Sequence, residues 1–144
     1  MPLSSVRTTI DPLEWQADVA DEKTRKHRSS RHNALIARYL EFLANNPNRP
    51  LCLTEICVAI GVAERTLRDV CVQHLGMGPI RYLTLRRMDQ VYYALSCADA
   101  SKTTVTRVAM DHGFLELGHF SVAYRSLFCE SPSETLRRPL YAMQ

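Results

Sequence analysis

The sequence has no apolar run close to the ~20 residues that a helix needs to cross a bilayer. Its first ten residues lack the charged start and apolar middle of a signal peptide. Glycine and proline are scarce, at 5 and 7 of 144 residues, and they fall between periodic segments. No stretch alternates polar and β-branched residues as a strand does. These absences predict a cytoplasmic, all-helical protein that has no membrane contact.

Motifs for catalysis and for metal binding are missing as well. There is no Gly-rich phosphate loop, no nucleophile elbow, and no set of His, Cys and Asp that suggests a metal site. The five cysteines are odd in number and lie in or beside helical stretches. We interpret them as small apolar fillers in a reducing compartment. The sequence therefore predicts neither an enzyme nor a metal or other cofactor.

A modest basic excess is present, and it is placed unevenly. The formal net charge is +3. Residues 1–30 hold five basic and five acidic side chains, so the thirteen basic and ten acidic side chains of residues 31–144 account for the whole excess. A basic bias of this kind is compatible with a polyanionic partner.

The chain divides at about residue 30. We expect residues 1–30 to form an N-terminal linker or tail with at most one short helix, starting at Pro12. The run 21–30 has no apolar residue and is interpreted as a linker or a solvated helix extension. From Arg31 to Leu43 an apolar face repeats at helical spacing. Further helices are predicted over 53–60, 64–74, 79–96, 105–112, 116–128 and 132–138.

Two stretches repeat one pattern, a short helix followed by Gly and an apolar residue. The first copy turns at Gly61-Val62 and the second at Gly113-Phe114, 52 residues later. Glycine suits such a corner because it adopts positive φ without steric cost. The helices that follow have matched apolar positions, displaced by one residue: Leu67, Val70, Cys71 and Leu75, then Phe120, Ala123, Tyr124 and Phe128. Two matched copies predict two helix-turn-helix units.

A long helix that begins at Pro79 separates the two copies. It carries an apolar stripe as far as Leu95 and would be about 27 Å long. Two recognition helices at its ends would reach successive major grooves, which are about 34 Å apart along one side of the duplex. We therefore expect subdomains over 31–78 and 97–144, joined by a linking helix over 79–96.

The stretch from Leu51 to Pro139 resembles the DNA-binding domain of the AraC/XylS family of bacterial regulators. The second unit and the linking helix carry the resemblance, in Val108-Ala109, Gly113-Phe114, His119-Phe120, Tyr124-Arg125, Ser131-Pro132-Ser133 and Tyr82-Leu83 with Arg86-Arg87-Met88. The departures from the family pattern are Ala63, Cys71, Cys129 and Thr135. The resemblance implies an all-α, seven-helix bundle of two helix-turn-helix subdomains joined by a long linking helix.

The resemblance also implies partners. Family members often carry a separate sensing or dimerisation domain, which this chain is too short to contain, and we expect RNA polymerase as a further partner. The polar run 21–30 favours a fragment of a longer regulator. A naturally short, stand-alone regulator is the alternative.

The first recognition helix carries the better candidates for reading bases. Arg65 and Arg68 lie three residues apart and share a face, and arginine can bind guanine O6 and N7 through two hydrogen bonds. By the resemblance, both occupy base-reading positions, as does Asp69. The alternative is an ordinary solvated face with an Arg65–Asp69 pair.

The second recognition helix presents a face with no cation before Arg125. Leu117 and Val122 can contact thymine methyl groups, with Gly118 permitting close approach and Ser121 beside them. We therefore expect this unit to add affinity more than specificity. The predicted phosphate contacts are Arg125, Thr104 and Thr106, together with Arg81 or Arg87 on the linking helix, while Arg86 is expected to be structural.

The predicted function is sequence-specific binding of double-stranded DNA in bacterial transcription regulation. Recognition helices near 64–74 and 116–128 would enter successive major grooves. The alternative is a helical protein-interaction module, in which an exposed Leu117 and Val122 dock a polymerase subunit or a sensing domain.

Overall fold

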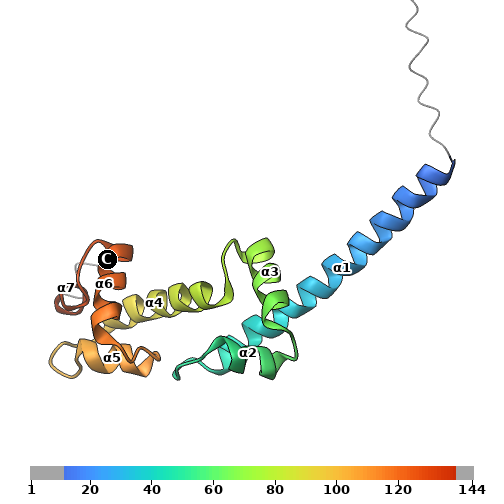
Figure 1. The fold of residues 1–144 in the computed structure, drawn as a ribbon. Coiled ribbons are helices and arrows are strands. Elements are labelled where there is room, and N and C mark those ends of the chain that lie inside the picture. Colours follow the sequence, from blue (N-terminus) through green and yellow to red (C-terminus); the bar gives the residue numbers. More distant parts are fainter. Residues whose placement is uncertain (1–11, 139–144) are drawn as a thin grey trace, which may run out of the picture.

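The computed structural model describes the backbone of residues 12–138 and the side chains of residues 22–138. Within that part of the chain every regular element is a helix. In chain order, and as labelled in Figure 1, they are α1 (Pro12–Asn45), α2 (Leu53–Ile60), α3 (Glu64–Leu75), α4 (Pro79–Cys97), α5 (Val105–Asp111), α6 (Leu117–Phe128) and α7 (Pro132–Arg137). The six helices after α1 agree with the predicted ranges to within one residue, because their start and stop signals are local.

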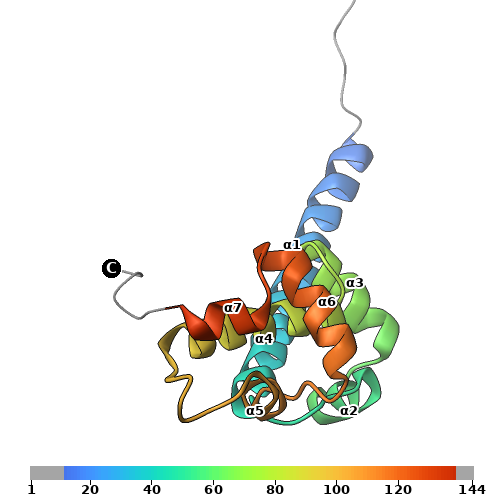
Figure 2. The ribbon, with the colours of Figure 1, turned by 90° about the vertical axis from the view of Figure 1, so that its left-hand side faces the viewer.

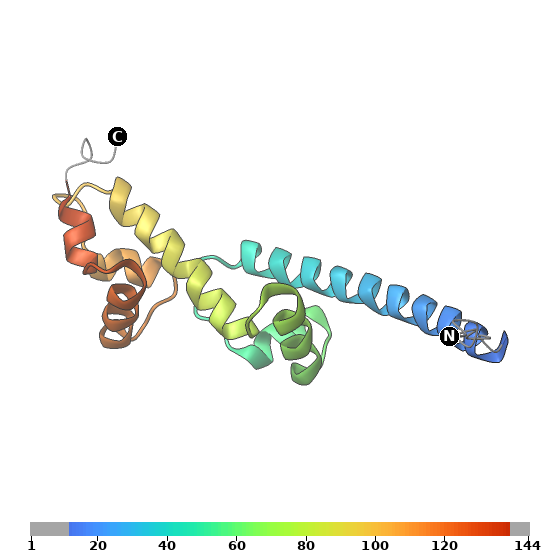
Figure 3. The ribbon, with the colours of Figure 1, turned by 90° about the horizontal axis from the view of Figure 1, so that it is seen from above.

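The first helix is longer than predicted. It begins at Pro12 rather than near Arg31, so the run 21–30 is a solvated extension of α1 and not a linker. The sequence has no glycine or proline between Leu13 and Asn46 that would end the helix. A Glu22–Lys26 ion pair at 3.5 Å adds modest support on the exposed surface. The outer half of α1 consequently projects beyond the rest of the fold, as Figures 1 and 3 show.

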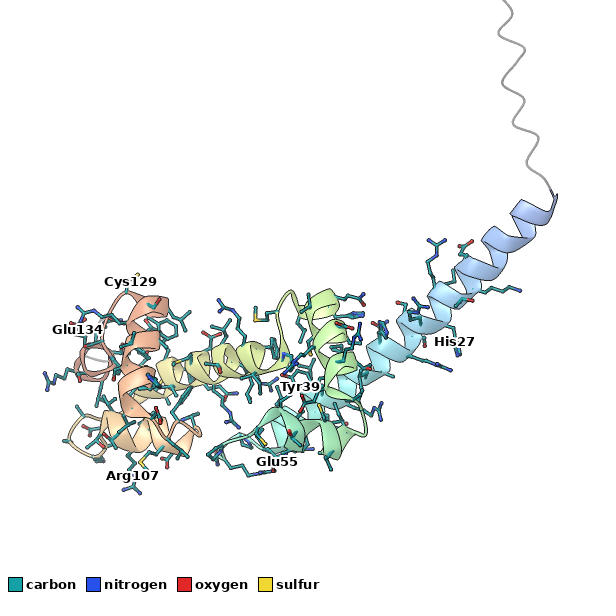
Figure 4. All side chains as sticks on the ribbon, in the orientation of Figure 1. His27, Tyr39, Glu55, Arg107, Cys129 and Glu134 are labelled. Carbon is teal, nitrogen blue, oxygen red and sulfur yellow. The ribbon has the colours of Figure 1, made fainter. Side chains whose placement is uncertain are left out.

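The first helix-turn-helix unit packs α2 and α3 against the inner half of α1 and the start of α4. Its core is largely aliphatic and includes two buried thiols, Cys57 and Cys71. Tyr39 of α1 is fully buried, and its hydroxyl donates to the Pro79 carbonyl at the start of α4. Figure 4 shows Tyr39 at this junction. That hydrogen bond ties the first unit to the linking helix.

The second unit packs α5, α6 and α7 around the second half of α4. Aromatic rings dominate its core, with Tyr124 and Phe128 at 4.7 Å and Phe114 and Phe120 at 5.0 Å between ring centroids. The Tyr124 hydroxyl donates to Thr135 Oγ1 at 2.6 Å, and both residues are fully buried. Thr135, which departs from the family pattern, therefore provides the acceptor for a tyrosine hydroxyl that would otherwise be buried without a partner.

The two units meet at a seam, which we define as Asn46, Arg49, Arg87 and Gly113. Arg87 of α4 is only 5% exposed, and its Nη2 donates to the Asn46 carbonyl at 2.9 Å. A Cβ built on Gly113 would stand 2.5 Å from Arg87 Nη1 and 3.1 Å from the Arg49 backbone. The loop after α1 and the turn of the second unit are thus in close contact across α4.

The seam corrects the role suggested for Arg87. A phosphate contact requires an exposed guanidinium, whereas this one is buried and already donates to a carbonyl of the first unit. Burial and the neighbouring Arg49 lower the pKa of Arg87. We therefore remove Arg87 from the predicted phosphate contacts and assign it a structural role between the two units.

Candidate nucleic-acid interface

The recognition helices α3 and α6 stand at opposite ends of α4. Figures 1 and 3 both show them on the same side of that helix. The 19 residues of α4 rise by about 28 Å, which is close to the pitch of B-DNA. The arrangement therefore presents two helices to one side of a duplex, as is required of recognition helices that enter successive major grooves.

Both units turn with the same local geometry. Gly61 has φ 71°, and the Val62 N–H donates to the Cys57 carbonyl at 3.0 Å. In the second unit Gly113 has φ 87°, and the Phe114 N–H donates to the Ala109 carbonyl, also at 3.0 Å. In both, the N–H after the glycine bonds to the carbonyl five residues back, which is the hydrogen bond that closes the C-terminus of a helix. The repeat seen in the sequence is therefore a repeat of backbone geometry.

The turns differ in length, as the displaced apolar positions predicted. α3 begins three residues after Gly61, whereas α6 begins four residues after Gly113. The extra residue is accommodated without altering which face of each helix is buried. Leu67 and Val70 face the first core, and Phe120 and Tyr124 face the second.

The outward face of α3 carries Arg65, Arg68 and Asp69, all of which are exposed. Among the described residues of α3, the ion pair joins Arg68 Nη2 to Glu64 Oε2 at 3.8 Å, and not Arg65 to Asp69. Glu64 is also held by the Thr54 hydroxyl, at 3.0 Å. An exposed pair of this kind contributes only a few tenths of a kcal/mol. Both arginines are therefore available to another partner.

The outward face of α6 is nearly uncharged. Gly118, Ser121 and Arg125 are exposed, and Val122 is 73% exposed. A Cβ on Gly118 would meet no other atom within 4 Å, so its surface is open. Leu117 is only partly exposed and packs against the second core. Val122 is therefore better placed than Leu117 to contact a thymine methyl group.

The other predicted phosphate contacts lie at the edges of this surface. Arg81 at the start of α4 and Thr106 on α5 are exposed. The Thr104 hydroxyl accepts from the Arg107 N–H at 3.2 Å and so caps α5. A further candidate, absent from the sequence predictions, is Arg107, an exposed cation in the first turn of α5 that Figure 4 shows projecting from the second unit. Its place in the first helix of a helix-turn-helix could have identified it.

Two further findings concern alternative kinds of protein. Cys52 and Cys57 have the C-x₄-C spacing of a zinc ligand pair, which the sequence analysis passed over, but no group of three or more metal-binding side chains occurs in the described residues. None of the described helices is both long enough and apolar enough to span a membrane.

Comparison with known proteins decides the family. Residues 56–138 match the family model of a helix-turn-helix domain. A crystal structure of a probable AraC family transcriptional regulator from Rhodopseudomonas palustris is 31% identical and superposes with a TM-score of 0.64, covering 74% of this chain and 99% of that one. The chain belongs to the AraC/XylS family. The resemblance carried by its second unit and linking helix is confirmed, and so is the all-α fold of paired helix-turn-helix subdomains.

AraC/XylS relatives include longer proteins. The XylDLEGF operon transcriptional activator of Pseudomonas putida is 32% identical over 109 residues, which cover 76% of this chain and 34% of that protein. XylDLEGF operon transcriptional activator 2 of the same species is 34% identical over 104 residues, covering 72% of this chain and 66% of that protein. The chain spans about a third of the first relative's length. It corresponds to the DNA-binding domain of a family of transcription regulators, a family that is not one of enzymes.

Proposed function

We propose that this domain binds double-stranded DNA sequence-specifically and thereby regulates bacterial transcription. The observation that carries the proposal is the placement of α3 and α6 on one side of α4, at the two ends of a helix about 28 Å long. The seam at Arg87 and Gly113 supports it further, because contact between the units limits their relative movement.

The two recognition helices divide the work of binding. Arg65 and Arg68 read bases from α3, with Asp69 beside them as an acceptor for cytosine N4. Gly118, Ser121 and Val122 approach the second groove from α6, with Leu117 a lesser contributor. The proposed phosphate contacts are Arg125, Arg81, Thr104 and Thr106, to which we add Arg107. Specificity is therefore weighted toward the first unit.

The intact regulator is proposed to act in the cytoplasm together with a sensing or dimerisation domain and RNA polymerase. The Pseudomonas putida relatives support this because they are transcriptional activators and the first of them is about three times as long as the matched region. Activation is consequently the favoured sign of regulation. The alternative, a helical module that only docks proteins, would use the exposed Val122 instead of the arginines of α3.

The proposal is tested by selecting bound duplexes from a random pool and measuring their affinity by fluorescence anisotropy. Arg65→Ala and Arg68→Ala should each lose about 1–3 kcal/mol of discrimination at a defined base pair. The matched control is Arg137→Ala, an exposed arginine on α7, which is not a recognition helix and lies to the left of α3 and α6 in Figure 2. Its affinity and base preference should match the parent chain.

Two results would overturn the proposal. One is a selection that enriches no sequence, with equal affinity for every duplex. The other is an enriched duplex whose preference survives both arginine substitutions unchanged. Capture of a protein partner in the absence of any duplex binding would favour the interaction module.

A further inference from the structure

The middle of α1, residues 22–38, is the most basic part of the described chain. Between Glu22 and Arg38 it carries six cations and a single anion, a net charge of +5 compared with +3 for the whole sequence. All six cations are exposed: Lys23, Arg25, Lys26, Arg28, Arg31 and Arg38. A helix with this much charge of one sign attracts polyanions.

Some of these cations share a face with the first core. Side chains three and four residues apart lie above one another on a helix. The face that buries Tyr39 and Leu35 therefore continues outward through Arg31 and Arg28 to Thr24. Where α1 leaves the core, its buried face changes from apolar to cationic.

This face forms one side of a groove, which we call the α1 basic groove. Arg28, Arg31 and Arg38 line it from α1, and Gly61, Val62 and Thr66 line it from the turn and recognition helix of the first unit. No carboxylate lines it.

The position of the groove is defined by contacts on both sides. Arg38 Nη1 donates to the Ile60 carbonyl at 3.1 Å, which holds α1 against the end of α2. Thr66 lies three residues before Asp69 and so shares its side of α3, which places the groove at the border of the face that is proposed to read bases. A polyanion in the groove would therefore be continuous with a duplex bound at α3.

The direction of α1 indicates which DNA would reach it. Figures 1 and 3 show α1 leaving the first unit on the side away from the second unit. From Arg38 to Glu22 the helix rises by about 24 Å, roughly the length of seven base pairs. The extension therefore lies outside the pair of recognition helices and next to the first of them.

We propose that the α1 basic groove binds the phosphate backbone of the DNA that flanks the first recognition site, on the side away from the second unit. The inference rests on the proposed duplex binding and extends it. The groove adds affinity and salt dependence without reading sequence, because guanidinium contacts to phosphates are made whatever the bases are.

The test uses the full chain and a selected duplex in three forms: the recognition sites alone, the sites with ten added base pairs beside the first unit, and the sites with ten added beside the second. Extension beside the first unit should raise the affinity and steepen its salt dependence. Extension beside the second unit should do neither. Equal behaviour of the two extended duplexes would overturn the proposal.

A double variant isolates the groove. Arg28→Gln/Arg31→Gln should remove the benefit of the first extension and reduce the salt slope by about 2, so that about tenfold less affinity is lost between 50 and 200 mM salt. Base preference should not change. The control, Lys23→Gln/Lys26→Gln, removes the same charge from residues that do not line the groove. Helix content measured by circular dichroism establishes that both variants fold.

The remaining outcomes are distinguishable. Equal losses in the two double variants would overturn the groove as the site and leave only the charge of α1 as the cause. A poly-glutamate peptide tests an acidic protein segment as the alternative ligand. If Arg28→Gln/Arg31→Gln loses the parent chain's binding of this peptide but keeps its salt slope on DNA, DNA is overturned as the ligand of the groove. Failure of the parent chain to bind any selected duplex would overturn the proposed function itself, and the groove with it.

Discussion

The two helix-turn-helix units close their turns with the same hydrogen bond but surround it with different chemistry. In the first unit the recognition helix begins at Ala63, which offers no side-chain cap, and its outward face carries two arginines. In the second unit α5 begins at a capping Thr104, and α7 begins at a capping box made by Ser131 and Glu134. The arginines of a recognition helix therefore belong to the first unit and the side-chain caps to the second, although α6 itself, like α3, has no side-chain cap.

The cores of the two units also differ in the side chains that fill them. The first unit buries two thiols among mostly aliphatic side chains, whereas the second packs five aromatic rings against one another. Aromatic contacts add stabilisation beyond the area they bury. The difference indicates that the second unit is built mainly as a stable anchor, while the first tolerates weaker local structure around the residues that are proposed to read DNA.

The largest expected effect comes from the two turn glycines. Gly113→Ala should cost about 2–5 kcal/mol of unfolding free energy. An alanine there is strained at positive φ, and its Cβ collides with Arg87 and the Arg49 backbone. Gly61→Ala has the same strain but meets no atom within 4 Å, so it should cost about 1–2 kcal/mol. Urea unfolding of both variants measures the difference. Equal losses would show that the seam is not tightly packed.

The next effect is expected at the seam itself. Arg87→Met should cost about 1–3 kcal/mol, since the partly buried Asn46 carbonyl loses its donor. Hydrogen exchange should then show the two units opening more independently. Arg81→Met, on an exposed part of the same helix, is the control and should change stability by less than about 0.5 kcal/mol. If the two variants behave alike, α4 alone couples the units.

Adding a cap to the first unit and removing one from the second should reduce the difference in stability between the units. Ala63 has extended backbone angles suited to an N-cap, so Ala63→Ser should stabilise the first unit by about 0.5–1 kcal/mol. Thr104→Ala should destabilise the second by about 1 kcal/mol, because the Arg107 N–H loses its acceptor. Denaturant midpoints of the single and double variants measure both effects. A destabilising Ala63→Ser would mean that the first unit is not limited by its missing cap.

The smallest effect concerns the thiols and needs no substitution. Burial, with the nearby Cys57 adding to it, raises the pKa of Cys71 to about 11. Iodoacetamide at pH 8.5 should therefore modify the exposed Cys52, Cys97 and Cys129 and spare Cys57 and Cys71 until the chain is unfolded. Mass spectrometry of the modified peptides checks this.

The same pKa has a defined sign for stability. The folded state retains the Cys71 proton more tightly than the unfolded chain does. The contribution of this thiol to the free energy of unfolding is therefore fully present below the unfolded pKa of about 8.5. It is lost as the pH rises toward about 11. Unfolding measured from pH 8 to pH 11 should therefore show a decline that Cys71→Ala reduces, since the raised pKa of Cys57 adds to it with the same sign. A pH-independent stability over that range would contradict the burial of the thiol.

Much of this organisation was predictable from residues that act locally. Gly61 and Gly113 mark the corners because positive φ is inexpensive only for glycine, and the helices that follow were placed by their apolar spacing. The sequence could not place the outer half of α1 with the same ease. Its charged residues have no apolar periodicity, so the absence of a helix breaker was the remaining signal.

The candidate contact residues divide in the same way. Arg65 and Arg68 share an exposed face because their spacing alone requires it once α3 is a helix. Leu117 and Arg87 were harder to place, because their environments depend on neighbours distant in the sequence. Arg87 meets a carbonyl 41 residues away, and no local pattern contains that contact.

The helices α2 to α7, the repeated turn and the outward side of each recognition helix can be read from the sequence, since they follow from backbone preference and periodicity. The tertiary structure alone decided how the units meet. Packing brings Gly113, Arg87 and Arg49 into contact across α4, and it brings Arg28 and Arg31 beside the turn at Gly61. The physical reason is that electrostatic and steric interactions depend on distance in space, and only the fold converts sequence separation into that distance.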